Sequence, residues 1–267
     1  MDGRGGFPAT SKLKDEMENV VMIQATNLSK VFPATKKTKE IRAVDGVSFE
    51  CQPSEIYGLL GTNGAGKTTT LRMLATILEP TGGTANVAGY DIIEEPEKVR
   101  ANVGFLSTAT ALYGRLTAKE MVEYFARLHG MDGEGLRKAI DSLFEMLGMN
   151  DFRNQRCEKL STGQKQKVSI ARTLVHDPKV MIFDEPTVGL DVIASRTIVG
   201  FIRQCRDRGK TVIFSTHVMT EVEKLCDRIG IIHRGRLLAE GSLAQLRERF
   251  GKQDLEDIFV DVLGDQP

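Results

Sequence analysis

The chain has 267 residues, 41% hydrophobic and 27% charged, which suits one large globular domain or a domain with an inserted subdomain. Lys and Arg together number 36, as do Asp and Glu, so the net charge is zero and nothing favours a nucleic acid partner. The four cysteines lie far apart and form no CxxC pair, which disfavours both a zinc site and a disulfide scaffold.

The sequence gives little indication of a membrane-spanning helix or a secretory signal. No apolar run reaches the roughly 18 residues that a membrane-spanning helix needs, and the charged start of the chain lacks the apolar region of a secretory signal. We therefore expect a cytoplasmic chain, with any membrane part supplied by another chain. Residues 1–20, which are Gly-rich and then charged, are expected to form a flexible arm, and the polar residues 251–267 a tail with little order.

The first part of the chain is predicted to form short strands. Alternating apolar residues predict strands at 22–26 and 44–51, separated by a lysine-rich stretch, 35–40. That stretch fits a solvated hairpin tip better than a contact for acidic lipid or a partner. A further strand, Ile56–Leu60, is apolar at every position, which predicts a central strand buried on both faces.

A glycine-rich loop follows that central strand and precedes a helix predicted at 69–78. Gly61 and Gly66 frame the loop, and Lys67 and Thr68 come directly after it. Strand, loop and helix in this order are the context of a phosphate-binding loop: glycines let backbone N–H groups converge, and the helix start adds more donors. Lys67 suits the outer phosphates, and the Thr68 hydroxyl suits Mg²⁺. The candidate nucleotide-binding residues are Gly61, Thr62, Asn63, Gly64, Ala65, Gly66, Lys67, Thr68 and Thr69.

Residues of about 109–170 favour helices. They follow a strand predicted at 99–106, and Thr117 begins an S/T-x-x-E capping pattern. Two amphipathic helices are predicted after it, and we interpret the whole segment as a helical subdomain inserted in an α/β core. Their expected buried residues are Met121, Tyr124, Phe125 and Leu128 in the first helix, and Ile140, Leu143, Phe144 and Leu147 in the second.

Two acids end a second buried strand, predicted at 180–183. An unpaired carboxylate is costly to bury, so Asp184 and Glu185 call for partners. In a chain with a phosphate-binding loop, Mg²⁺ is such a partner for Asp184, and Glu185 would act as the general base on the attacking water. The alternative for the pair alone is a solvated strand end.

His217 follows a strand predicted at 211–215. Ligands bind at this end of an open α/β sheet, so His217 is positioned to donate a hydrogen bond to the γ-phosphate. A single histidine is more often a polar surface residue, so this signal is weak by itself.

The segment 160–164 reads Leu-Ser-Thr-Gly-Gln and precedes a helix. Ser161 and Gln164 fit a capping box, which is a purely structural role. The functional alternative adds a second anion site made by Ser161 and the free N–H groups. Two phosphate-binding helix starts in one chain suggest that two chains share one nucleotide.

Taken together, the loop 61–69, the segment 160–164, Asp184–Glu185, the Gly-Leu-Asp at 189–191 and His217 resemble the ATP-binding subunits of ABC transporters. The resemblance covers about residues 22–245, and the order of the five motifs is specific. It implies a P-loop NTPase α/β core with a mixed sheet, an N-terminal antiparallel β subdomain and an inserted helical subdomain, all within residues 21–250.

The resemblance also implies roles that spacing alone does not. Phe32 lies where this family stacks an aromatic ring on adenine, Glu185 matches the catalytic base and His217 the γ-phosphate sensor. It implies ATP and Mg²⁺ as cofactors, and a head-to-tail homodimer, or a dimer with a paralogue, that covers each ATP. It further implies transmembrane permease subunits as partners and a location on the inner membrane face. The covering residues would be Ser161, Thr162, Gly163, Gln164 and Asp191.

Two positions depart from the family pattern. Thr162 stands where the first Gly of Leu-Ser-Gly-Gly-Gln is usual, and Thr108 stands where the family has a Gln that senses Mg²⁺ and touches the membrane subunit. Ser107 or Thr108 would replace that Gln through water, or the coupling differs. The segment 105–108 and the residues after it are similar to the branch containing bacterial sodium-exporting ATPases, which implies export, with Na⁺ as a candidate substrate.

Two other classes of protein fit parts of this pattern. A soluble ABC-type ATPase acting on nucleic acid or ribosomes usually has two such domains or long inserted arms, whereas 161 − 67 = 94 residues separate Lys67 from Ser161 here. A P-loop GTPase or small-molecule kinase would leave the 160–164 segment and His217 unexplained. We therefore predict an ATPase subunit that powers export through separate membrane subunits.

Overall fold

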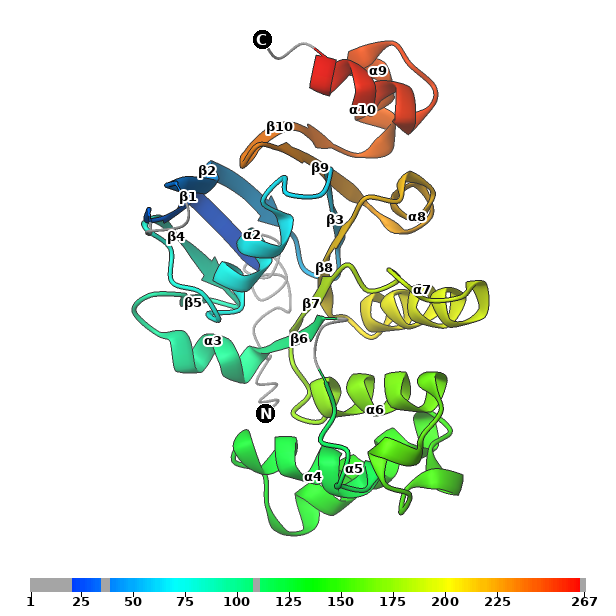
Figure 1. The fold of residues 1–267 in the computed structure, drawn as a ribbon. Coiled ribbons are helices and arrows are strands. Elements are labelled where there is room, and N and C mark those ends of the chain that lie inside the picture. The colour runs from blue at the N-terminus through cyan, green and yellow to red at the C-terminus, as the bar shows by residue number, and fades with distance from the viewer. Residues whose placement is uncertain (1–20, 35–38, 108–110, 265–267) are drawn as a thin grey trace, which may run out of the picture.

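The fold contains two sheets, one antiparallel and one mixed, with helices packed against them (Figure 1). The structure, a computed structural model, describes residues 21–34, 39–107 and 111–264. The arm expected at 1–20, most of the lysine-rich stretch and Thr108 lie outside the described residues. The predicted fold class is confirmed in both its antiparallel subdomain and its mixed sheet.

The antiparallel sheet has the strand order β2-β1-β4-β5. Its first strand is longer than the predicted 22–26 because the pairing with β2 continues through several register shifts. The lysine-rich stretch lies between β1 and β2, as expected for a hairpin connection. The strands are β1 Ile23–Phe32, β2 Ile41–Cys51, β4 Gly82–Val87 and β5 Tyr90–Asp91.

The mixed sheet has the order β10-β9-β3-β8-β7-β6 and supports the site. Strands β3, β7 and β8 are buried at every residue, which confirms that the continuous apolar runs mark central strands. Strand β9 joins β3 in parallel and pairs with β10 in antiparallel orientation. The strands are β3 Ile56–Leu60, β6 Val103–Ser107, β7 Val180–Asp184, β8 Thr211–Thr216, β9 Arg228–His233 and β10 Arg236–Gly241.

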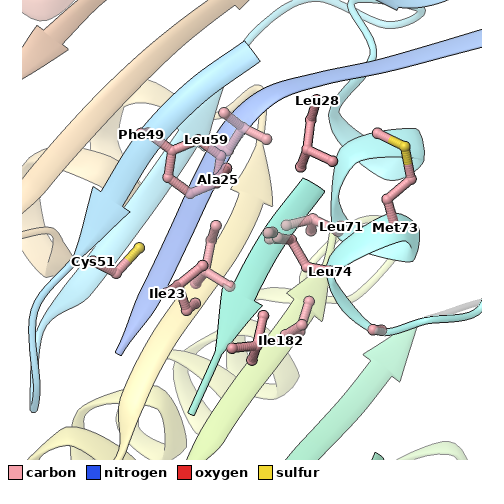
Figure 2. Close-up of a cluster of buried hydrophobic side chains, with 14 of the residues drawn as sticks. Ile23, Ala25, Leu28, Phe49, Cys51, Leu59, Leu71, Met73, Leu74 and Ile182 are labelled. Carbon is pink, nitrogen blue, oxygen red and sulfur yellow. The ribbon is translucent and has the colours of Figure 1, made fainter. Parts of the chain in front are cut away.

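Helices cover both faces of the mixed sheet. Helix α2 (Lys67–Leu74) lies between the two sheets, and its Leu71 and Leu74 pack with Ile23 of β1 and Ile182 of β7 (Figure 2). On the opposite face, α7 (Val192–Asp207) packs against the alternate residues of β7 and β8. Helix α8 (Met219–Leu225) was not predicted and packs beside β3.

The strand predicted at 99–106 is wrong in its first half. Residues Pro96–Asn102 form helix α3, and the strand β6 begins only at Val103. Proline at the first helical position fixes φ in the helical range and lacks the N–H group that a helix start leaves unpaired. That start signal was missed because Val99 and Ala101 also continue the alternating apolar positions of the strand.

The helical region has a core of its own, formed by α4 (Ala118–Leu128), α5 (Gly133–Met146) and α6 (Thr162–Leu174). The Thr117 capping box is present, as predicted. Tyr124 and Leu128 are exposed, whereas Ala118, Val122 and Ala126 are buried, so the predicted buried face of α4 is wrong in part. Two 3₁₀ turns, Asn150–Phe152 and Cys157–Lys159, lead into α6.

The predicted C-terminal tail is wrong over most of its length. After α9 (Leu243–Phe250), residues Leu255–Gly264 form helix α10. Its residues Leu255, Ile258 and Val262 are buried against β9, β10 and α8. The polar composition of this segment predicts little order, although its apolar positions recur at helical spacing.

Candidate functional site

The parallel strands β3, β7 and β8 end side by side and bring three sequence motifs together. Leu60 pairs with Thr216 and Asp184 pairs with Ser215 in the strand register. The glycine loop after β3, the acids at the end of β7 and His217 after β8 therefore meet at one edge of the sheet. This is the edge where ligands bind in open α/β sheets.

The glycine loop is held in a conformation that two of its glycines make possible. Gly64 and Gly66 have φ values of 78° and 107°, which disfavour residues with a Cβ atom. A Cβ at Gly61 would lie 2.4 Å from the Ile232 carbonyl oxygen. The loop therefore packs closely on β9 at one end and starts helix α2 at the other, while Thr62 and Asn63 remain exposed.

Lys67 is enclosed by the loop it follows, and its side chain is only 4% exposed. Its ammonium group donates to the carbonyl oxygens of Gly61 and Thr62, at 2.8 and 3.0 Å. It also lies 3.0 Å from Oε1 of Glu185. The cation thus sits at the mouth of the glycine loop, held by acceptors that a phosphate oxygen can replace.

Asp184 is the centre of a second set of hydrogen bonds. It accepts from the hydroxyl of Thr68 at 2.8 Å and from the hydroxyl of Ser215 at 2.9 Å, both at Oδ1. Asp184 is buried, so these two donors compensate for the lost solvation of its carboxylate. Carboxylate and hydroxyl oxygens in contact are the ligand types that Mg²⁺ prefers, so the residues present fit such an ion.

Glu185 is positioned by its backbone and by two side chains. Its φ of 47° lies in the left-handed region, and its N–H group donates to the Ser215 hydroxyl at 3.0 Å. Its other carboxylate oxygen, Oε2, lies 3.0 Å from Nδ1 of His217. Glu185 therefore lies between Lys67 and His217 and contacts both of the other groups predicted to perform catalysis.

The remaining predicted residues lie apart from this contact set. Phe32 is 39% exposed, with the Lys30 ammonium 5.6 Å from its ring centroid. Asp191 accepts from the backbone N–H of Ala194 at 2.9 Å at the start of α7. Both residues are exposed, and their roles remain predictions.

The 160–164 segment starts helix α6 and forms the predicted capping box. The N–H of Ser161 donates to the Gln164 side chain at 2.9 Å, and the N–H of Gln164 donates to the Ser161 hydroxyl at 3.3 Å. Within the described part of the chain, no hydrogen bond or ion pair joins this segment to the glycine loop. Thr162 and Gly163 are exposed beside it, so this half of the predicted site faces solvent.

Sequence reasoning missed two residues that organise the site. Ser215 links Asp184 to the backbone of Glu185, and Glu221 of α8 accepts hydroxyl hydrogen bonds from Thr187 and Thr216, both at 3.1 Å. The signal for Ser215 was its place two residues before His217, directly after the apolar run 212–214. Glu221 gave no local signal, because its partners are brought to it only by the fold.

Comparisons with known proteins agree with this geometry. A family model described as ABC transporter matches residues 44–188, more than half of the chain. The ABC transporter ATP-binding protein NatA of Bacillus subtilis (strain 168) is 43% identical over 243 residues, covering 91% of this chain and 98% of NatA. The Nod factor export ATP-binding protein I of Paraburkholderia xenovorans (strain LB400) is 41% identical over 216 residues, covering 80% and 71% of the two chains.

A solved structure of the same kind is the ATP-binding cassette MJ0796 in a dimeric, post-hydrolysis state bound to ADP and Pi. It superposes with a TM-score of 0.73 at 27% identity, covering 83% of this chain and 98% of that one. This chain therefore belongs to the ABC transporter family, as its ATP-binding subunit and as an ATPase with a P-loop fold. Subunits of this class dimerise and work with membrane permeases. No helix among the described residues is long and apolar enough to cross a bilayer.

Proposed function

We propose that this chain hydrolyses ATP, with Mg²⁺, to power export through separate transmembrane permease subunits, and that Na⁺ is the exported ion. The observation that carries the proposal is the contact of Lys67, Glu185 and His217 at the strand ends, beside Thr68 and Asp184. The identity to NatA and the resemblance of segment 105–108 to the sodium-exporting branch support the choice of substrate.

Each residue of the site has its own role in ATP binding or hydrolysis. The N–H groups of the Gly61–Thr69 loop and the Lys67 ammonium bind the phosphates, and Phe32 stacks on adenine. Thr68 and Asp184 hold Mg²⁺, which neutralises phosphate charge when bound. In this reaction a water oxygen attacks the γ-phosphorus, its proton passes to the Glu185 carboxylate, and the bond from that phosphorus to the bridging oxygen of ADP breaks. His217 donates to a γ-phosphate oxygen.

Binding of ATP changes the contacts of Glu185. The phosphate oxygens replace the Glu185 carboxylate on Lys67, because a phosphate brings more negative charge to the same ammonium group. Glu185 is then released toward the attacking water while His217 still orients it. Ser161, Thr162, Gly163, Gln164 and Asp191 of a second copy, or of a paralogue, cover the nucleotide and complete the site.

The permease partners place the chain on the inner face of the membrane. A head-to-tail dimer closes on ATP and opens after hydrolysis, and the permeases receive this motion. Residues 21–250 form the ATP-binding unit in this proposal, with a helical subdomain at about 109–170. Ser107 or Thr108 takes the place of the usual Gln that senses the metal; position 108 lies outside the described residues.

The test is the change of Glu185 to Gln, which keeps the shape of the side chain and removes its basicity. We expect unchanged ATP affinity by calorimetry, hydrolysis slower by about a hundred-fold or more by phosphate release, and an ATP-bound dimer by light scattering. The exposed Glu248 of α9, changed to Gln, is the matched control. Full turnover in the Glu185 variant would remove this residue from the role of base.

The transport role is tested separately in cells and membranes. Native membranes should yield a polytopic protein together with this chain, and cells carrying the Glu185→Gln variant should lose Na⁺ efflux. Ribosomal proteins or RNA recovered in place of a membrane protein would support the soluble ATPase that the sequence left as an alternative. If a membrane partner is recovered but cells carrying the variant keep normal Na⁺ efflux, the transporter function is supported and Na⁺ is excluded as its substrate.

A further inference from the structure

A pocket of 480 Å³ lies within the helical region, between helices α4 and α5. In Figure 1 these helices lie at the lower end of the molecule, apart from helix α2, which follows the glycine loop. The volume is in the range of pockets that hold small organic molecules. We call it the α4–α5 pocket. The charged residues that line it are Lys119, Glu123, Arg127, Arg137, Asp141 and Arg153.

The two acids of the pocket are each paired with an arginine. Glu123 accepts a hydrogen bond from Arg127, one turn further along α4, at 2.7 Å. Asp141 of α5 accepts from Arg153, also at 2.7 Å. Each pair holds a guanidinium group at the wall of the pocket and cancels one positive charge. Two of the four cations are then left in excess.

The two cations in excess come from the two facing helices. Lys119 lies in the first turn of α4, and Arg137 lies in the second turn of α5. Among the described residues, no carboxylate lies within 4.0 Å of either cationic group. Arg137 donates only from Nε, to the Gly133 carbonyl oxygen at 3.4 Å, so its terminal N–H groups are left for a ligand. A guanidinium group with a free outer edge offers two donors that match the oxygens of an anion.

Arg153 is a fixed part of the pocket wall. Its carbonyl oxygen accepts from the backbone N–H of Lys119 at 2.9 Å, and its guanidinium carbon lies 5.4 Å from the ring centroid of Phe144. Its side chain is 29% exposed. Because the backbone contact, the ring and the paired carboxylate all hold this segment in place, an anion meets a wall that is already formed, and little conformational freedom is lost on binding.

The floor of the pocket is apolar. Leu136 and Ile140, one turn apart on α5, line it and are 3% and 2% exposed, because they also belong to the core of the helical region. A bare inorganic ion would leave this floor uncovered. A pocket with an apolar floor and a few placed charges suits an organic molecule that carries an anionic group.

We propose that the α4–α5 pocket binds a phosphomonoester, either a small soluble molecule or a lipid headgroup with a terminal phosphate. Such a phosphate has a charge of about −1.5 to −2 at neutral pH, which matches the two cations in excess. Lys119 and Arg137 bind the phosphate oxygens, the two paired arginines border the site, and the organic part packs on the apolar floor. A monocarboxylate would leave one of the two cations without a partner. This site is separate from the nucleotide site and does not depend on the proposed function.

The test is isothermal titration of the full chain with glycerol 3-phosphate, with glycerol as the matched probe that lacks the phosphate. The pocket variant is Lys119→Gln/Arg137→Gln, which removes the cations in excess and keeps both ion pairs. The control variant is Lys138→Gln/Arg156→Gln, which removes two exposed cations of the same region that do not line the pocket. Thermal melts check folding. If the melt of the pocket variant is shifted, Arg137→Gln alone carries the test, because Arg137 is exposed.

We expect wild type and the control variant to bind glycerol 3-phosphate and not glycerol. The pocket variant should bind glycerol 3-phosphate more weakly by about ten-fold or more, since two charge-assisted contacts to the phosphate are lost. Raising the salt concentration should weaken binding in wild type, because exposed charges are screened.

Vesicles distinguish the two sources of the phosphate. Phosphatidylcholine vesicles with and without phosphatidic acid are floated with wild type and with the pocket variant. Recruitment that requires both phosphatidic acid and the two pocket cations identifies a lipid headgroup as the ligand. Binding in the titration without recruitment to vesicles identifies a soluble phosphomonoester.

Three results would overturn the proposal. If wild type neither binds glycerol 3-phosphate nor is recruited by phosphatidic acid, the pocket is not a phosphate site. If the pocket variant binds or is recruited as well as wild type, the phosphate is bound elsewhere, such as on the glycine loop. If succinate binds wild type as tightly as glycerol 3-phosphate, the pocket selects a dicarboxylate, and the ligand class is wrong.

Discussion

The sheet half of the nucleotide site and the helical half satisfy their polar groups in different ways. In the sheet half, residues from distant parts of the chain hold one another: Lys67 pairs with Glu185, and Asp184 accepts hydrogen bonds from Thr68 and Ser215. In the helical half, Ser161 and Gln164 satisfy each other within four consecutive residues on the surface. The first half depends on tertiary packing, whereas the second is locally complete and exposed, as expected for a surface presented to another chain.

Among these predictions, the substitution of Lys67 should have the largest effect on the sheet half of the nucleotide site. We expect Lys67→Ala to weaken ATP binding by about a hundred-fold or more, because a charge-assisted contact to phosphate is worth roughly 3 kcal/mol in an enclosed site. Isothermal titration of the purified chain measures this. The exposed Lys138 of α5, changed to Ala, controls for loss of a lysine elsewhere.

An unchanged nucleotide affinity in the Lys67 variant would contradict the phosphate role of the loop. A thermal melt of the variant checks that the chain is folded. If the melt is shifted strongly, Lys67→Met, which keeps the apolar stem, separates the loss of charge from the loss of packing.

The contact between the mixed sheet and the helical region makes the free energy of unfolding depend on pH. His176 follows α6, stacks on His129 of the helical region and donates from Nε2 to the Val103 carbonyl of β6, which leaves Nδ1 buried without a hydrogen bond. Its pKa falls from 6.5 to about 4, chiefly because burial disfavours the charged ring, with His129 and Lys210 contributing and Asp177 opposing.

Because the folded pKa is below the unfolded one, the unfolded chain binds more protons between these two values. The stabilising contribution is complete above about pH 6.5 and is lost as the pH falls to about 4, amounting to roughly 3 kcal/mol. Denaturant unfolding between pH 7 and 4 should show this loss in wild type and a smaller loss in His176→Phe, which keeps the stacking. Equal pH dependence in both would assign the effect to other groups.

The role of the helical half in catalysis can be tested by comparing capping boxes that have the same hydrogen-bond pattern. Ser161→Ala and Thr117→Ala each remove a side-chain acceptor from a helix start, and each should lower the free energy of unfolding by about 1 kcal/mol. Only Ser161→Ala should also slow ATP hydrolysis, by about ten-fold or more, since it removes a donor to the nucleotide bound on a second copy.

Equal ATPase activity in the two capping variants would show that Ser161 has only the structural role that its capping box already explains. Equal loss of activity would point to helix stability as the common cause. Ser242→Ala at the start of α9 adds a third box of the same geometry, and it should lose stability without any loss of activity.

Much of the sheet half was predictable because its signals are local. Continuous apolar runs identified β3 and β7, and the loop between β3 and α2 has a spacing that few other sites share. The Ser161 capping box was predictable for the same reason. The link through Ser215, the pairing of Lys67 with Glu185, and the support from Glu221 were not, since each joins residues brought together only by folding.

Errors in the prediction also have physical causes. Val99 fits a strand as well as a helix because apolar residues recur at alternate positions, Ala101 and Val103. The proline at the start of α3 favours the helix. In α4, the spacing of Tyr124 and Leu128 is that of a buried face, but both are exposed. A periodic apolar face indicates that a helix packs against a neighbour. It does not indicate whether that neighbour belongs to the same chain.

Strand β6 lies at the end of the mixed sheet, which makes one of its sides an open backbone edge. Such edges attract strands from other molecules and promote aggregation. Here the Val103 carbonyl is already engaged by His176, and α3 and α6 contact the strand. A subunit that must meet other chains repeatedly can therefore do so through side chains, while its sheet is protected from unwanted strand addition.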